Sequence, residues 1–175
     1  TIPAGAVVSD NMIYSLTAAN TGSVVTTVSA IYVSAVTNLL VNRNKIYDLR
    51  NNSTSTGLYP PPAASGINMA TPGIGTNIVN NQIVLGSGQT TNTTFIGIWA
   101  SVTGSHSVNA SNNSVVITGT AASGSLPSYA MLRGGNSTSE VTAVMNLVNN
   151  IFINNRTGGT GKHYAIANQV APPTL

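Results

Sequence analysis

One pattern decides the fold, and it is written most clearly as Asn77-Ile78-Val79-Asn80-Asn81-Gln82-Ile83-Val84 and again as Asn146-Leu147-Val148-Asn149-Asn150-Ile151-Phe152-Ile153. Three further copies lie at Asp10–Leu16, Arg43–Leu49 and Asn112–Ile117. Aligned on their shared asparagine, the five copies are 33, 37, 32 and 37 residues apart. The asparagines that set this register are Asn11, Asn44, Asn81, Asn113 and Asn150.

A second marker repeats with the same period. It is a small residue followed by an aliphatic one, and its copies are 36, 31, 33 and 35 residues apart. The copies are Ala30-Ile31, Gly66-Ile67, Gly97-Ile98, Ala130-Met131 and Ala165-Ile166. Because two independent markers share a period of about 34 residues, the chain consists of repeated units of about that length.

The residues within each unit favour strands over helices. Short β-branched runs are separated by clusters of Gly, Asn, Ser and Pro, which is typical of strands and turns. Helical repeats would need long periodic runs of Ala, Leu, Glu and Lys, and propeller blades need four hairpin-linked strands with more aromatic anchors. The window from Glu140 to Asn150 has helical spacing, but the equivalent stretches of the other units resemble strands.

A strand-and-turn unit of this length cannot enclose its own apolar side, so successive units must stack to build a continuous core. The repeat therefore predicts an all-β solenoid of parallel strands with about five coils. One inward stack is expected to consist of Ile13, Ile46, Ile83, Val115 and Phe152. A second is expected to consist of Ile31, Ile67, Ile98, Met131 and Ile166.

The recurring asparagine has a physical explanation. Its amide both donates and accepts, so identical turns stacked about 4.8 Å apart can bond along a ladder. Asparagine also tolerates the left-handed backbone of sharp turns. We therefore interpret the five register asparagines as a structural turn ladder, and we expect Asp10 and Arg43, which share the preceding position in successive units, to lie close together.

The chain resembles right-handed parallel β-helix domains of the pectate-lyase-like architecture, in the Asn- and Thr-rich form of large secreted proteins from gliding and related bacteria. The Asn-Asn-x-Ile/Phe units carry this resemblance, and the most specific stretch is Asn149–Ile166. The resemblance covers nearly the whole chain and implies a right-handed coil. It also implies an extracellular or cell-surface bacterial protein, similar to cargo of the type IX secretion route. We expect residues 1–175 to form a single β-helix segment of a longer chain.

Composition excludes several classes of function. Only 5% of the 175 residues are charged, whereas Asn, Ser and Thr together make up 36%. The six basic residues form no clustered patch, so nucleic acid is not an expected partner. There is no cysteine, which removes disulfides and thiolate metal sites, and no apolar run approaches the ~20 residues of a membrane span. No metal or cofactor is predicted.

Carboxyl groups are too few to favour catalysis. Glycoside hydrolysis needs two carboxyl groups about 5 to 10 Å apart, and the chain offers only Asp10, Asp48 and Glu140. His106 and His163 stand alone in the sequence, without the neighbours that a triad or metal site requires. The segment is therefore predicted to be non-catalytic, and a polysaccharide lyase or hydrolase is kept as the alternative.

The expected function is structural or adhesive. A coil open at both ends exposes apolar faces and strand edges, so the expected partners are further coils of the same chain or identical subunits stacked end to end. Such a solenoid would serve as a scaffold, adhesin stalk or filament subunit. Surface glycans are a further possible partner, because aromatic residues near the variable loops could stack on sugar rings, although for Trp99 and Tyr164, which flank the second marker, packing in the core or at the coil edge is favoured. The four aromatic residues are Tyr59, Trp99, Tyr129 and Tyr164.

Overall fold

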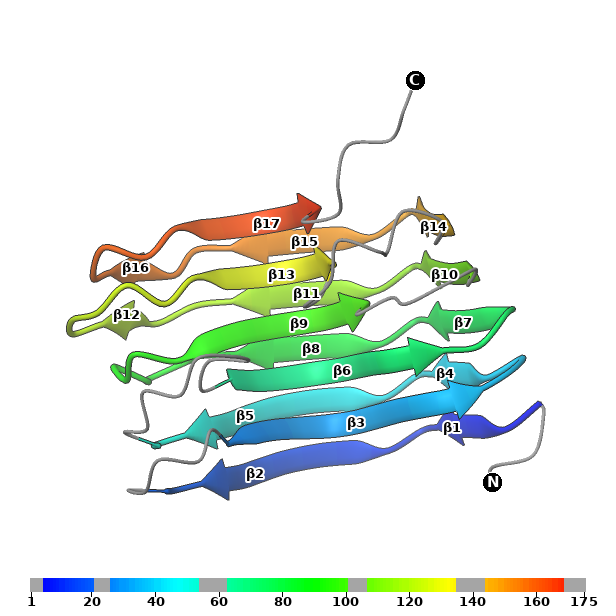
Figure 1. Cartoon of the computed structure of the whole chain (residues 1–175), viewed down its shortest axis with the longest axis horizontal. Helices are drawn as coiled ribbons and strands as arrows, with labels where there is room; N and C mark the ends of the chain where they lie inside the picture. The colour runs from blue at the N-terminus through cyan, green and yellow to red at the C-terminus, as the bar shows by residue number, and fades with distance from the viewer. Residues whose placement is uncertain (1–4, 21–25, 54–62, 101–106, 135–143, 169–175) are drawn as a thin grey trace.

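The computed structural model describes residues 5–20, 26–53, 63–100, 107–134 and 144–168. All regular secondary structure in these ranges is β-strand, and every strand pairing is parallel. The strands wind into a β-solenoid (Figure 1). The fold class predicted from the repeat is therefore confirmed, and the 140–150 window contains a strand.

Three sheets of five strands form the sides of the coil. Sheet A contains, in spatial order, β1 (Val7–Ser9), β4 (Leu40–Asn42), β7 (Thr76–Val79), β10 (Ser107–Ser111) and β14 (Val144–Val148). Sheet B contains β2 (Met12–Ala18), β5 (Lys45–Asn51), β8 (Gln82–Leu85), β11 (Ser114–Ile117) and β15 (Ile151–Asn154). Sheet C contains β3 (Thr27–Val36), β6 (Ala63–Pro72), β9 (Thr94–Ala100), β13 (Ser128–Arg133) and β17 (His163–Asn168). A small fourth sheet pairs β12 (Thr120–Ala121) with β16 (Thr157–Gly158).

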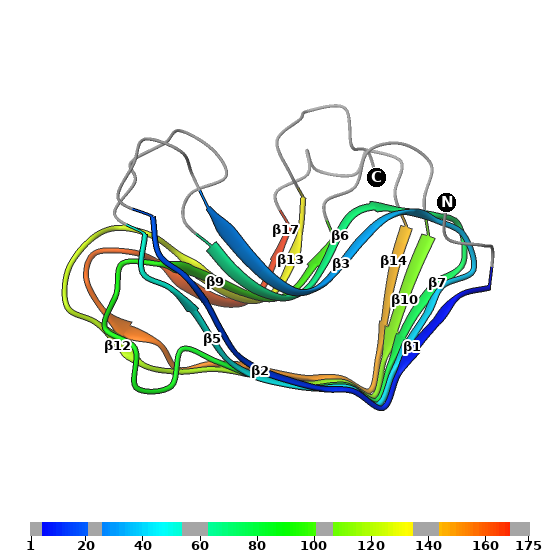
Figure 2. The same ribbon diagram turned by 90° about the horizontal axis from the view of Figure 1, so that it is seen from below.

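The coil is right-handed. As the chain climbs in Figure 1, the strands of sheet C run to the right in front, and those of sheet B run to the left behind them. Figure 2 looks along the coil from its N-terminal end and shows the three sheets as its sides. We call each winding a rung, so that rung 1 holds β1–β3 and rung 5 holds β14–β17.

The number of turns differs slightly from the expected five coils. Each sheet has five strands, so the path from its first strand to its last makes about four turns. The last winding ends at Asn168 within the described residues, before the chain returns to sheet A. The repeat counts five copies of a motif, whereas a turn is the interval between two copies.

Both expected inward stacks lie in register. In sheet B the paired positions are Ile13, Ile46, Ile83, Val115 and Phe152. In sheet C they are Ile31, Ile67, Ile98, Met131 and Ile166. The members in the middle rungs are fully buried, while Ile13 and Phe152 are partly buried and Ile166 is 53% exposed. The difference arises because rungs 1 and 5 have a neighbour on one side only within the described residues.

The small residue of the second marker is required by packing across the coil. A Cβ on Gly66 would lie 2.8 Å from a side-chain carbon of Ile83, and one on Gly97 would lie 2.2 Å from a side-chain carbon of Val115. Ile83 and Val115 belong to the facing sheet B stack. At the small-residue position of the second marker, sheet C therefore lies very close to sheet B. This position is glycine in rungs 2 and 3 and alanine in rungs 1, 4 and 5.

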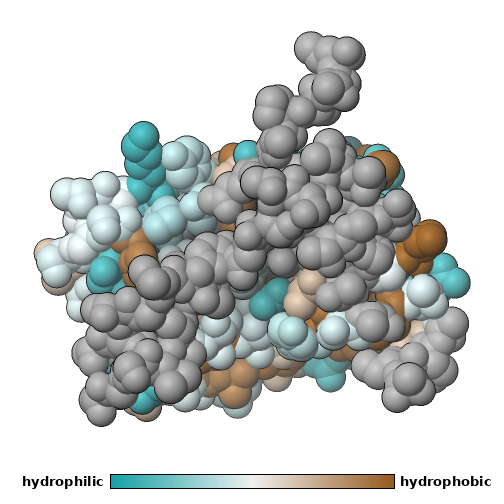
Figure 3. Space-filling view, viewed as in Figure 1, coloured by the Kyte–Doolittle hydropathy of each residue, from teal (hydrophilic) through white to brown (hydrophobic). Residues whose placement is uncertain are grey.

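Apolar side chains are exposed at both ends of the coil. Rung 1 exposes 60% of Met12 and 51% of Tyr14, and rung 5 exposes 55% of Ile151 and 54% of Val148. Figure 3 shows apolar surface along the lower rim, over β2. Among the described residues, no helix is long and apolar enough to cross a bilayer.

Candidate functional site

The sharp corner between sheets A and B depends on one left-handed residue per rung. The residue before each register asparagine has φ between 52° and 60°. These residues are Asp10, Arg43, Asn80, Asn112 and Asn149. The register asparagine itself is not left-handed, so the turn conformation predicted for it belongs to the position before it. Asparagine fills that position in three rungs because its short polar side chain tolerates φ > 0.

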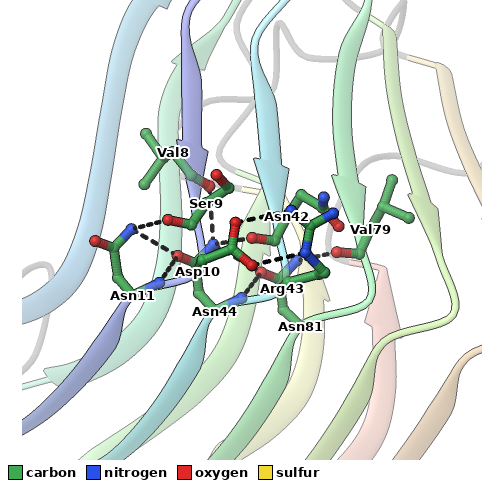
Figure 4. A network of polar contacts seen from close by, with 9 residues as sticks. All are labelled: Val8, Ser9, Asp10, Asn11, Asn42, Arg43, Asn44, Val79 and Asn81. Atoms are coloured by element: carbon green, nitrogen blue, oxygen red, sulfur yellow. Dashed lines mark hydrogen bonds and ion pairs between the residues drawn. The ribbon is translucent and has the colours of Figure 1, made fainter.

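The five register asparagines form a continuous, directional ladder. In each rung the side-chain Nδ2 donates to the Oδ1 of the next rung's asparagine, at 2.8, 2.9, 2.9 and 2.9 Å from Asn11 upward. The backbone N–H of the same residue donates to the same oxygen, at 3.1, 3.0, 3.0 and 2.9 Å. Figure 4 shows the first three members. The predicted ladder is therefore confirmed, and all of its bonds point toward the C-terminal end.

Each Nδ2 also donates back to the preceding rung. Its acceptor there is the backbone carbonyl three residues before that rung's asparagine, at 2.8 to 3.0 Å. The acceptors are Val8, Val41, Ile78 and Ala110. Asn44, Asn81 and Asn113 are each 1% exposed. Their amides can be buried without a large desolvation cost because the donors and acceptors have hydrogen-bond partners.

A second asparagine ladder lies on the outer face of sheet A. Asn109 donates to the Oδ1 of Asn77 at 3.1 Å, and Asn146 donates to the Oδ1 of Asn109 at 2.8 Å. Sequence reasoning missed these residues. Their signal was the pattern Asn-x-x-Asn-Asn, which places an asparagine four residues before the register position in the last three units.

Two of the three carboxyl groups are held by arginines on the surface. Asp10 accepts two bonds of 2.7 Å from Arg43, as the shared position predicted, and these bonds hold the pKa of Asp10 below its usual value. Asp48 accepts from Arg50 at 2.7 Å and from Ser15 at 3.0 Å. The lowered pKa of Asp10 favours its ionised form, which suits structural pairing better than proton donation. Glu140 lies outside the described residues.

Three of the four candidate glycan-contact aromatics lie together on sheet C, but only Tyr164 among them is exposed. Trp99 and Tyr129 are 7% and 6% exposed and pack with Ile96 and Leu132. The Trp99 indole N–H donates to the Gly134 carbonyl at 2.9 Å. Tyr164 is 40% exposed and stacks on Tyr129 with ring centroids 5.6 Å apart. Tyr59 lies outside the described residues. Glycan contact therefore stays a prediction for Tyr164, whose side chain is exposed.

A shallow groove of about 680 Å³ crosses the outer face of sheet B between β5 and β8. The Tyr14 and Tyr47 rings stack in parallel, 5.0 Å apart, on this face. The next residue of their column is Val84, and the smaller side chain leaves room beside Tyr47. Lys45 and Gln82 line the groove beside it, so the surface combines an aromatic ring with hydrogen-bonding groups.

Arg156 is an internal cation at the opposite corner of the coil. It is 4% exposed, its guanidinium lies 4.6 Å from the Phe95 ring centroid, and Nη2 donates to the Thr91 carbonyl at 2.7 Å. Burial lowers the pKa of Arg156. Because Phe95 is two rungs away from it, Arg156 ties the corner loops of rungs 3 and 5 together.

His163 gives this corner a pH dependence. Burial lowers the pKa of His163 below 6.5, and the charge of Arg156 adds to the effect. Below pH 6.5 the unfolded chain binds a proton that the folded chain does not, so stability is complete above pH 6.5 and falls as pH drops toward the lowered pKa. Thermal unfolding between pH 7.5 and 5 should show this loss, and a His163→Gln variant should show less of it. Equal slopes for the two proteins would contradict the assignment.

The described residues contain no group of three or more His, Cys, Asp or Glu side chains that could hold a metal ion. In comparisons with known proteins, the chain matches no family model, no curated protein and no solved structure. The geometry of the ladder, the coil ends and the outer faces is therefore the basis on which function is argued.

Proposed function

We propose that the chain is a non-catalytic structural or adhesive solenoid of an extracellular or cell-surface bacterial protein, acting as a scaffold, adhesin stalk or filament subunit. One observation supports this proposal: among the described residues, the first and last strand of each five-stranded sheet pair on one side only, and rungs 1 and 5 expose apolar side chains. Such ends bind further windings, either of the same chain or of identical subunits. The resemblance to pectate-lyase-like β-helices exported by the type IX route supports the extracellular setting.

A polysaccharide lyase or hydrolase is the alternative, and the geometry supports it less well. A retaining or inverting hydrolase needs one protonated and one ionised carboxyl group facing each other. Asp10 and Asp48 instead each bind an arginine. Neither arrangement leaves a proton donor poised over a shared substrate position.

An adhesive role is favoured by the groove between β5 and β8. Tyr47 offers an aromatic ring, and Lys45, Gln82 and Ser87 offer polar groups around it, which is a combination that binds sugars through stacking and hydrogen bonds. This surface is separate from the coil ends. A stalk could therefore stack through its ends and contact a glycan through its side.

Sedimentation velocity over a wide concentration range tests the structural role. We expect the weight-average mass to rise with concentration through end-to-end association, and we expect no cleavage of polysaccharides by the wild type. A strictly monomeric protein would contradict the self-stacking role. Polysaccharide cleavage that falls sharply in Asp48→Asn would establish the enzymatic alternative. Glycan-array binding that Tyr47→Ala abolishes would identify the groove as the adhesive surface.

A further inference from the structure

A column of aromatic rings on the outer face of sheet B stops in the second of the five described rungs. Tyr14 and Tyr47 are paired on β2 and β5. Their rings have an interplanar angle of 1° and centroids 5.0 Å apart, close to the spacing of about 4.8 Å between neighbouring strands. The residue paired with Tyr47 on β8 is Val84, and Val116 follows on β11. The column therefore continues as small aliphatic side chains beyond Tyr47.

One face of the Tyr47 ring is left open by this change of residue. Tyr14 covers the face toward rung 1, and because the two rings are stacked, the other face looks toward rung 3, above the shorter side chain of Val84. The Tyr47 hydroxyl also donates to the sulfur of Met12 at 3.6 Å, which holds the ring from the same side as Tyr14. A ring that is already held in place binds a ligand at a small cost in conformational entropy.

Polar groups lie at both ends of the groove of about 680 Å³ that contains this open face. Lys45 and Gln82, which are paired on β5 and β8, line one end, and Asp48 and Ser87 line the other. The groove thus follows the direction of the strands and crosses the coil. Hydrogen-bonding groups are therefore available at two opposite edges of a ring that stacks on Tyr47.

We propose that the groove is a stacking subsite for one pyranose ring of a glycan whose rings are joined through equatorial bonds, with the glycan running along the strands and across the coil. This proposal rests on the adhesive role proposed above and adds the class of glycan and its direction. The bound ring takes the place of a third aromatic ring over Val84, with one apolar face on Tyr47. Its hydroxyl groups lie at the ring edge and reach Lys45 and Gln82 at one end and Ser87 at the other.

The direction of the groove selects the linkage between the sugar rings. An equatorial bond leaves a pyranose ring close to the ring plane, so a chain of equatorially linked rings continues along the groove. An axial bond leaves through a ring face, and here one face lies against Tyr47 while the other is turned toward Val116 of the next rung. Both bonds of a β-1,4-linked glucose are equatorial, whereas an α-1,4 link includes an axial bond. The groove therefore favours the β-linked chain.

Cellohexaose and maltohexaose test the linkage, because both are 1,4-linked glucose hexamers and they differ only in the configuration of the link. In isothermal titration calorimetry with the whole chain, cellohexaose should bind at least tenfold more tightly than maltohexaose. The α-1,4-linked hexamer of galacturonate tests whether charge decides instead, and it should bind no better than maltohexaose. Equal binding of cellohexaose and maltohexaose, or tighter binding of the acidic hexamer, would overturn the proposed class of glycan.

Three tyrosine substitutions in the same outward column test the position of the subsite. Val84→Tyr continues the ring column and fills the subsite, so cellohexaose binding should weaken at least tenfold while the thermal midpoint stays at or above the wild-type value. Val116→Tyr, one rung further on, adds an aromatic face on the other side of the bound ring and should tighten binding several-fold. Ile153→Tyr, in the rung after that, is the matched control and should leave binding within about twofold of wild type.

The outcomes separate this proposal from the one on which it rests. Wild-type affinity in Val84→Tyr, or weaker binding in Val116→Tyr, would overturn the stacking subsite and leave the adhesive role to another surface. Failure of cellohexaose to bind, with other glycans binding through Tyr47, would overturn the class of glycan and keep the groove. Absence of binding to any hexamer or array glycan would overturn the subsite and the adhesive role together, while sedimentation would still decide the scaffold role.

Discussion

Asn81→Leu should lower the free energy of unfolding by roughly 3 to 5 kcal/mol, because several buried groups lose their partners together. Asn81 is 1% exposed and exchanges hydrogen bonds with Asn44 below it and Asn113 above it. It also donates to the carbonyl of Val41. The leucine side chain has a similar volume but can neither donate nor accept a hydrogen bond. The destabilisation therefore comes from buried polar groups left without partners and not from a change in packing volume.

Urea unfolding followed by circular dichroism measures this effect. Asn11→Leu is the matched control, since Asn11 is exposed at the end of the ladder and its neighbours can bond to water instead. Its cost should be about 1 kcal/mol. If Asn81→Leu cost no more than Asn11→Leu, the ladder would not be the stabilising feature of this corner.

Gly97→Ala should destabilise the protein by roughly 3 kcal/mol through overpacking. The new Cβ would lie 2.2 Å from a side-chain carbon of Val115 and 2.5 Å from the backbone oxygen of Ala130. A rotamer change can relieve the first contact, but the second requires the backbone of the next rung to move. The strain is therefore transmitted to rung 4 and cannot be absorbed locally.

Gly88→Ala separates this packing effect from the general effect of losing a glycine. Gly88 has φ of 67° and nothing within 4 Å of an added Cβ, so its alanine variant should cost only about 1 kcal/mol of backbone strain. Thermal unfolding of the two variants side by side gives the comparison. Equal midpoints would show that close approach at Gly97 is not what fixes its identity.

The parts of this structure that were predictable are those that recur. The register asparagines and the two aliphatic columns repeat once per winding, so their neighbours in space follow from the period alone. The outer ladder through Asn109 also repeats, but its signal is confined to three units and was hidden by the overall abundance of asparagine. Its position on an outward face could be assigned only once the strand register was known.

Features that depend on a single rung were not predictable. The place of Trp99 beside a repeated marker favoured packing, and Trp99 is buried, but the marker does not specify the residues that pack with it, Ile96 and Leu132 on the outer face of sheet C. Arg156 reaches Phe95 across two rungs, a contact that no periodic pattern specifies. The left-handed conformation predicted for the register asparagine lies instead at the residue before it, because the ladder amide must follow the corner to point along the coil.

The bonds that join neighbouring windings run along the coil axis, across the strands (Figure 1), which sets how the molecule responds to mechanical load. Tension applied along that axis acts directly on these bonds and on one boundary between windings at a time, since each winding touches mainly its immediate neighbours. A tether built from this fold would thus yield in discrete steps. Each step would release about 120 Å of extended polypeptide, the contour length of one winding.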